Sequence, residues 1–152
     1  MKTYYFDFSQ NNEAIGVIRK DACVLPAGAR VFAMSSKDKN EAYDKIKEDF
    51  DVHFIFEDNV PEIGFYAVPF ISIFAYDSSG GLFASVSGIT DFESDENIIY
   101  ISSCSSVFLA ADNGRTFLKN IGNWKKNLVP FSSVELFPSL IQAKEKYDFI
   151  EL

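Results

Sequence analysis

Short apolar runs separated by turn residues fill the middle of this 152-residue chain. Between two of the runs, the segment Asp77-Ser78-Ser79-Gly80-Gly81 ends in two glycines, which supply the positive φ that a hairpin loop needs. Pro69 places a bend or an edge within the longest run. Consecutive strands joined by short turns pair in antiparallel fashion, so this pattern favours an α+β fold over a doubly wound α/β fold. The expected strands cover residues 52–56, 65–76, 82–86, 98–101 and 107–111.

Helical spacing flanks this strand region on both sides. The apolar residues of three segments recur at the interval of one helix face, and Pro138 suits the first turn of the last segment. At the N-terminus we expect a strand over residues 3–8, followed by a turn, and an interruption at Leu25-Pro26-Ala27-Gly28. With no linker in evidence, residues 1–152 are predicted to form one domain with a mainly antiparallel sheet and flanking helices. The expected helices cover residues 41–49, 116–123 and 138–147.

Charge is distributed very unevenly along the chain. The net charge is −8, yet residues 48–114 contain no Lys or Arg and twelve Asp or Glu, while each flank carries a small positive excess. A negative field of this kind repels phosphate backbones and anionic lipid, so nucleic acid and membrane surfaces are not expected as ligands. It attracts a basic protein instead, because complementary charge raises the rate of association. The alternative interpretation is that the excess charge only keeps the protein in solution.

Catalytic motifs are missing from the sequence. His53 is the one histidine, which excludes metal sites with several imidazoles, and no GxSxG elbow or phosphate-binding glycine loop occurs. In a strand, His53 faces away from Val52 and Phe54, and we expect it on the solvent side. The acidic segment at residues 91–96 has Glu96 where a calcium loop requires glycine. We therefore expect no catalytic residue, no cofactor and no metal.

Cys23 and Cys104 are too few for a disulfide scaffold and do not form a CxxC pair. We expect each to be a buried thiol in a reducing compartment. No apolar run is long enough for a membrane helix, and the N-terminal residues lack the features of an export signal. Together these features indicate a cytoplasmic protein.

The order of features over about residues 65–121 resembles the SUKH superfamily, which includes fungal cell-wall-assembly regulators and bacterial immunity proteins. A strand ends in the Phe74-Ala75 step, the Asp/Gly turn at 77–81 follows, two further strands come next, and a Phe117-Leu118 step opens a helix. The Leu25-Pro26 step is also found in that family, although an aromatic residue and an Asn-Gly-Gly turn do not follow it here. The resemblance implies an α+β sheet flanked by helices, no catalysis, and the binding and neutralising of a toxin, often a nuclease or deaminase.

The function expected from charge and resemblance is therefore that of a non-catalytic binding protein, an immunity protein for a basic toxin, acting as a monomer or weak homodimer. Two alternatives stay open: a small-ligand binder or carboxylate-based enzyme, and a subunit that packs through exposed aromatics such as Phe65 and Tyr66. Exposed acids of the lysine-free region would steer the partner and pair at the rim of the interface. The partner-binding residues expected are Asp77, Asp91, Glu93, Asp95, Glu96 and Asp112.

Overall fold

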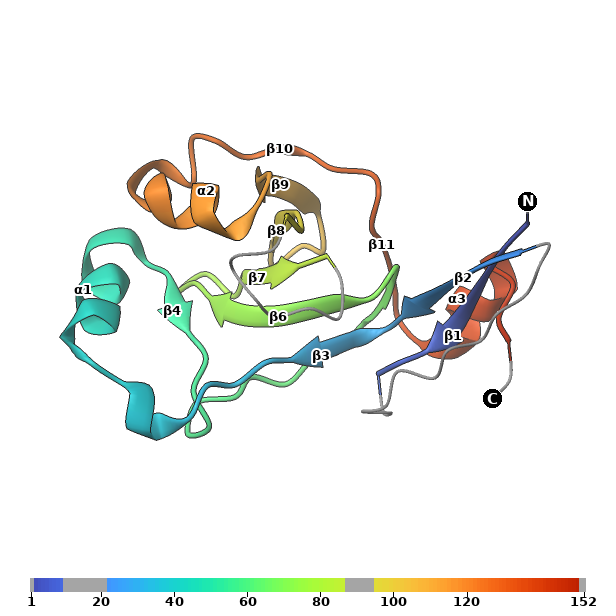
Figure 1. The fold of residues 1–152 in the computed structure, drawn as a ribbon, viewed down its shortest axis with the longest axis horizontal. Helices are drawn as coiled ribbons and strands as arrows, with labels where there is room; N and C mark the ends of the chain where they lie inside the picture. The colour runs from blue at the N-terminus through green and yellow to red at the C-terminus, as the bar shows by residue number, and fades with distance from the viewer. Residues whose placement is uncertain (1, 10–21, 87–94, 151–152) are drawn as a thin grey trace.

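A seven-stranded sheet forms the centre of the described part of the molecule, a computed structural model that describes residues 2–9, 22–86 and 95–150 (Figure 1). Its strands follow the order β10-β9-β8-β7-β6-β3, and β4 also pairs with β6. From β6 to β10 every neighbouring pair is antiparallel, so the α+β class predicted from the sequence is confirmed. The strands are β3 (Ala29–Val31), β4 (His53–Phe54), β6 (Ile71–Tyr76), β7 (Leu82–Ser85), β8 (Ile98–Ile101), β9 (Val107–Ala111) and β10 (Val129–Pro130).

Two segments share the outer edge of β6. The first half of β6 pairs in parallel with β3, in a register that places Ala29 opposite Ile71. The second half pairs antiparallel with β4, which places His53 opposite Tyr76. The parallel pair of β3 and β6 was not predicted, because short turns indicate pairing only between strands that are consecutive in the chain.

Both faces of the sheet are buried, and a β-bulge determines which side chains reach each face. The pairing of β6 with β7 shifts between Ile73 and Ala75, which leaves Phe74 as the extra residue. Phe74 and Ala75 consequently pack on one face with Phe83, while Ile73 packs on the opposite face. This two-sided burial explains why the sequence of β6 is a continuous apolar run without alternation.

One face of the sheet is covered by α1 (Glu41–Phe50), by α2 (Gly114–Lys119) and by the 3-10 turn Ile121–Asn123 that follows α2. The Asn40 side chain caps α1 by accepting a hydrogen bond of 2.9 Å from the backbone N–H of Ala42. Figure 1 shows the two helices on the same side of the molecule. Trp124, which follows the 3-10 turn, donates from its Nε1 to the carbonyl of Phe50 at the end of α1 at 2.7 Å.

The remaining strands and the last helix form a second group beside the main sheet (Figure 1). Ala27, Tyr66, Val68 and Ala143 are its buried residues. Both ends of the described chain lie in this group, because Tyr5 bridges to Phe149. Its elements are β1 (Lys2–Asp7) parallel to β2 (Ala22–Ala27), β5 (Tyr66–Val68) antiparallel to β11 (Glu135–Phe137), and α3 (Leu140–Lys146).

Several boundaries differ from those predicted. The expected interruption at residues 25–28 is wrong, because β2 continues through Leu25 and Pro26 and the chain turns only at Gly28, with φ of 114°. Pro138 lies outside α3, because the Ser139 side chain caps the helix by accepting from the N–H of Gln142. Phe65 is half-buried and Tyr66 is buried, so Tyr66 in particular is not an exposed interface anchor.

Other predicted elements are confirmed closely. Strands 98–101 and 107–111 match β8 and β9, and the helix at 41–49 matches α1 to within one residue. The helix at 116–123 is divided into α2 and the 3-10 turn. Most of the turn expected after residues 3–8 lies outside the described residues, as does the first part of the acidic segment at 91–96. Among the described residues, no helix has the length and apolar character needed to cross a membrane.

Replacement of Phe83 by Ala is expected to destabilise the fold by about 3–5 kcal/mol, the range for removing a buried aromatic ring from a core. Phe83 is fully buried and its ring centroid lies 4.8 Å from that of Trp124 and 5.5 Å from that of Phe117. Urea denaturation followed by circular dichroism measures the loss. The control is Leu118→Ala on α2, where the side chain is 41% exposed and the expected loss is below about 1 kcal/mol. Similar losses in the two variants would contradict the assignment of Phe83 to the centre of the core.

Candidate functional site

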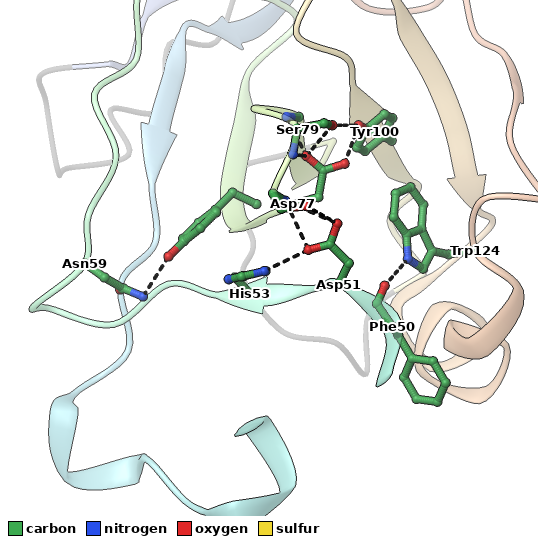
Figure 2. Close-up of polar contacts among 11 residues, drawn as sticks. Phe50, Asp51, His53, Asn59, Asp77, Ser79, Tyr100 and Trp124 are labelled. Atoms are coloured by element: carbon green, nitrogen blue, oxygen red, sulfur yellow. Dashed lines mark hydrogen bonds and ion pairs between the residues drawn. The ribbon is translucent and has the colours of Figure 1, made fainter. Parts of the chain in front are cut away.

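The densest polar cluster lies where the β6–β7 turn meets the end of α1 (Figure 2). We call it the turn cluster. It joins three parts of the chain that are distant in sequence, and it contains the one histidine of the protein. Its members are Asp51, His53, Asp77, Ser78, Ser79 and Tyr100.

Asp77 is a buried carboxylate with only 5% of its surface exposed. Its Oδ1 accepts hydrogen bonds from the backbone N–H groups of Ser79 at 3.0 Å and Gly81 at 2.7 Å, and from the Ser79 hydroxyl at 2.8 Å. Its Oδ2 accepts from the Tyr100 hydroxyl at 2.6 Å. Four donors thus compensate the burial of one charge. The prediction of Asp77 as an exposed steering residue is wrong, because its carboxylate holds the turn instead.

The two glycines of the turn have separate roles. Gly80 adopts φ of 89°, which side-chain-bearing residues rarely adopt. At Gly81 the constraint is space, since a Cβ there would lie 2.1 Å from the hydroxyl oxygen of Tyr100. The turn therefore packs its backbone directly on the ring that donates to Asp77.

Asp51 connects α1 to the same turn. It follows α1 in the left-handed conformation, with φ of 58°. Its carboxylate accepts from the backbone N–H of Ser78 at 3.1 Å and from the Ser78 hydroxyl at 2.7 Å. Partial burial alone would raise the pKa of the Asp51 carboxyl, but the hydrogen bonds from Ser78 and His53 outweigh it and lower that pKa.

His53 projects away from the buried Val52 and Phe54, as its place in the strand predicts. The ring is only partly exposed, because it stacks on Tyr76 with a centroid distance of 4.9 Å. Its Nε2 lies 2.8 Å from the Asp51 Oδ1. His53 is thus held on one side by a ring and on the other by a carboxylate.

The turn cluster contains serine, histidine and aspartate but does not have the geometry of a catalytic triad. In a triad the histidine accepts the proton of the serine hydroxyl. Here the Ser78 hydroxyl donates to Asp51, and His53 binds the same carboxylate. Burial, reinforced by the hydrogen bond to Asp77, raises the pKa of Tyr100 from 10.0 to about 12, so this phenol keeps its proton at neutral pH. The groups of the cluster satisfy one another, and they fix the turn.

The acids predicted to bind a partner are divided between two ends of the sheet. Ser85 pairs with Ile98 and Ile98 pairs with Ala111, so the chain entering β8 and the chain leaving β9 meet at one end. Asp95, Glu96 and Asp112 lie there, and we call them the acidic end. Asp77 lies at the opposite end, in the β6–β7 turn. Asp91 and Glu93 lie outside the described residues.

Exposure differs among the residues of the acidic end. The side chain of Asp95 is 92% exposed, and its Oδ1 accepts from Arg115 at 3.3 Å. Asp112 is also exposed and makes no ion pair within the described residues, while Glu96 is half-buried. Two of the three carboxylates are therefore open to an approaching cation.

A cavity of about 290 Å³ opens beside Asp112, between β9 and α2. We call it the β9–α2 cavity. Asp112 is predicted from the sequence as a partner-binding residue, but the other polar residues of the cavity are not, because lone threonines and asparagines carry no motif. The lining consists of Leu109, Ala110, Ala111, Asp112, Thr116, Phe117, Asn120, Trp124 and Asn127.

No group of three or more potential metal ligands occurs in the parts of the chain that the structure describes. Cys23 is half-buried, but Cys104 is exposed in the β8–β9 turn, so the expectation that both thiols are buried is wrong for Cys104.

Comparison of the chain with protein-family models, with curated proteins and with solved structures finds no match in any of the three.

Replacement of Gly81 by Ala is expected to destabilise the protein by about 2–3 kcal/mol, because the new methyl group collides with the Tyr100 ring. Thermal unfolding followed by circular dichroism tests this. Gly64→Ala is the matched control, since no heavy atom lies within 4 Å of a Cβ at that position. A Gly81 variant as stable as the control would show that the turn does not press on Tyr100.

Tyr100 is also expected to make the stability depend on alkaline pH. In the unfolded chain its phenol ionises near pH 10.0, whereas in the folded protein the pKa is about 12. Its contribution is complete below pH 10 and is lost as the pH rises toward 12. The urea midpoint of the parent protein should therefore fall more between pH 9.5 and 11.5 than that of Tyr100→Phe. A fall of equal size in the two proteins would contradict the raised pKa. Tyr147, whose pKa is also about 12, is present in both proteins, so its effect on the urea midpoint is the same in each.

Proposed function

We propose that this chain is a non-catalytic protein-binding module, an immunity protein of the SUKH type that neutralises a basic toxin. The observation that carries the proposal is the acidic end, where Asp95, Glu96 and Asp112 come together from two separate parts of the lysine-free region. A cluster of exposed carboxylates attracts a basic surface and increases its association rate.

The state of the carboxyl groups supports a binding role. An acid catalyst that works near neutral pH needs a raised carboxyl pKa. Hydrogen bonds and ion pairs instead lower the pKa of Asp51, Asp58 and Glu135. These groups, and Asp77 with its four donors, already have partners within the chain, whereas Asp112 makes no ion pair within the described residues and is open to a partner.

The order of elements is compatible with the SUKH resemblance. The strand ending near Phe74-Ala75, the Asp/Gly turn, β8, β9 and the helix that contains Phe117 follow one another as the resemblance expects. Membership of the family stays a prediction. The same holds for the cytoplasmic location, for the monomeric or weakly dimeric state and for the toxin as partner.

One observation favours the alternative of a small-ligand binder. The β9–α2 cavity lies beside Asp112 and combines apolar and polar side chains, as ligand sites do. It has a single carboxylate, so it does not offer the pair of carboxyl groups that a glycosidase-like enzyme requires.

The proposal is tested by reversing charge at the acidic end. A tagged protein captures partners from lysate of the native host, a salt step releases them, and the released basic protein is purified for rate measurements. The triple variant D95K/E96K/D112K is expected to reduce the association rate at low salt by about tenfold or more, and this effect should diminish at high salt.

The matched control is the triple variant E57K/E62K/E145K, which changes the net charge equally but at exposed residues outside the acidic end. It should reduce the rate much less than the first variant. Equal reductions would mean that only total charge matters. The absence of a basic protein that is captured by the tagged chain and released by salt would overturn the proposal.

A further inference from the structure

We infer that the β9–α2 cavity binds a guanidinium group, and that in the complex this group is an arginine side chain of the basic partner. The assignment of the guanidinium to an arginine of the partner rests on the proposed function. The preference of the cavity for a guanidinium is argued from its lining residues alone. Nothing in the sequence motifs assigns a ligand to this cavity.

The size of the cavity limits what it can hold. Its volume of about 290 Å³ is at the lower limit of small-molecule sites, which suits one long side chain better than a nucleotide cofactor. Phe117 and Trp124 are buried, and together with Leu109 they make an apolar wall. Such a wall suits the methylene stem of an arginine, which packs on apolar surface while its charged end reaches polar groups.

The polar part of the cavity is rich in unused acceptors. The side chains of Asp112, Thr116, Asn120 and Asn127 make no hydrogen bond or ion pair with the described residues of the chain. As acceptors they offer two carboxylate oxygens, one hydroxyl oxygen and two amide oxygens, and the hydroxyl and amide NH2 groups can also donate to solvent. A guanidinium has five N–H donors in a planar fork, so it can reach more of these oxygens at once than an ammonium can.

Charge also selects a cation. Asp112 is the one charged residue in the lining, and no Lys or Arg contributes to it. The neighbouring Arg115 is not part of the lining, and its guanidinium lies 3.3 Å from the Asp95 carboxylate. Lys125 also lies outside the lining, with its Nζ 5.4 Å from the centroid of the Trp124 ring. Asp112 is therefore the charge of the lining that would balance a bound cation.

The cavity is held in shape before a ligand arrives. Asn113 caps α2 by accepting from the backbone N–H of Thr116 at 2.8 Å, which fixes the helix against the end of β9. Trp124 is fixed by its hydrogen bond of 2.7 Å to the carbonyl of Phe50. Preorganised walls reduce the entropy lost on binding.

The test is a titration of the full chain with N-acetyl-arginine amide, followed by ¹H–¹⁵N NMR and by the fluorescence of Trp124, the one tryptophan. Saturable shifts are expected at the side-chain amides of Asn120 and Asn127 and at the Trp124 indole. N-acetyl-citrulline amide has nearly the same shape without the charge, and it should bind at least about tenfold more weakly.

Two variants identify the site. Asp112→Asn should weaken binding of the arginine probe about tenfold, while Glu57→Gln, at an exposed acid outside both the acidic end and the cavity lining, should change it less than about twofold. Both positions are exposed, so both variants should fold, and circular dichroism verifies this. No saturable shift, equal affinity for the citrulline probe, or equal effects of the two variants would each overturn the inference.

The result of the arginine titration can be distinguished from the result of the test of the proposed function. If the arginine probe fails to bind while charge reversal still slows the partner, only the cavity assignment is overturned. If the probe binds through Asp112 but no basic partner exists, the cavity assignment stands as a small-ligand site and the proposed function falls. If both hold, Asp112→Asn should also speed dissociation of the partner more than Asp95→Asn does.

Discussion

The hydrogen bond between the buried Asp77 carboxylate and the Tyr100 hydroxyl is the interaction on which the central sheet depends. It joins the β6–β7 turn to the middle of β8, and it requires glycine at position 81 because the turn lies directly on the tyrosine ring. Asp51 then attaches the end of α1 to the same turn through Ser78. One ionised side chain thus organises a turn, a strand and, indirectly, a helix. Such a group tolerates little change, because the removal of one donor leaves a buried charge less compensated.

The carboxylates that hold the turn and the carboxylates that are exposed to solvent lie at opposite ends of the sheet. At the turn end, the carboxylates are occupied by donors from the chain itself. At the acidic end, Asp95 and Asp112 face solvent, and a cavity with unused acceptors lies beside Asp112. The antiparallel hairpins produce this separation, because each reversal of the chain places successive connections at alternate ends. A binding surface at the acidic end can therefore change without disturbing the interactions that hold the turn.

The elements that are best predicted from the sequence are those determined by residues close together in the chain. Strands β8 and β9, the glycine turn and α1 follow from patterns within a few residues, and they were located almost to the residue. The parallel pairing of β3 with β6 was not predictable in the same way, since it joins segments separated by a 3-10 turn, a helix and two strands. The candidate site was predicted in part. Asp95, Glu96 and Asp112 are among the acids selected from the sequence, but that these three lie at one end of the sheet follows only from the strand pairing. The burial of Asp77 depends on Tyr100, and the cavity depends on Asn120 and Asn127, which have no motif of their own.

The pairing of β1 with the last described segment has a consequence for how the protein is made. The backbone N–H of Tyr5 donates to the carbonyl of Asp148, and the N–H of Ile150 donates to the carbonyl of Tyr5. These partners are far apart in the sequence, so this edge of β1 can close only after the segment around Asp148 has been synthesised. The main sheet and its two helices need no residue beyond Val134 for their buried core and can form earlier. The edge of β1 that faces the segment 148–150 is thus completed later than the main sheet.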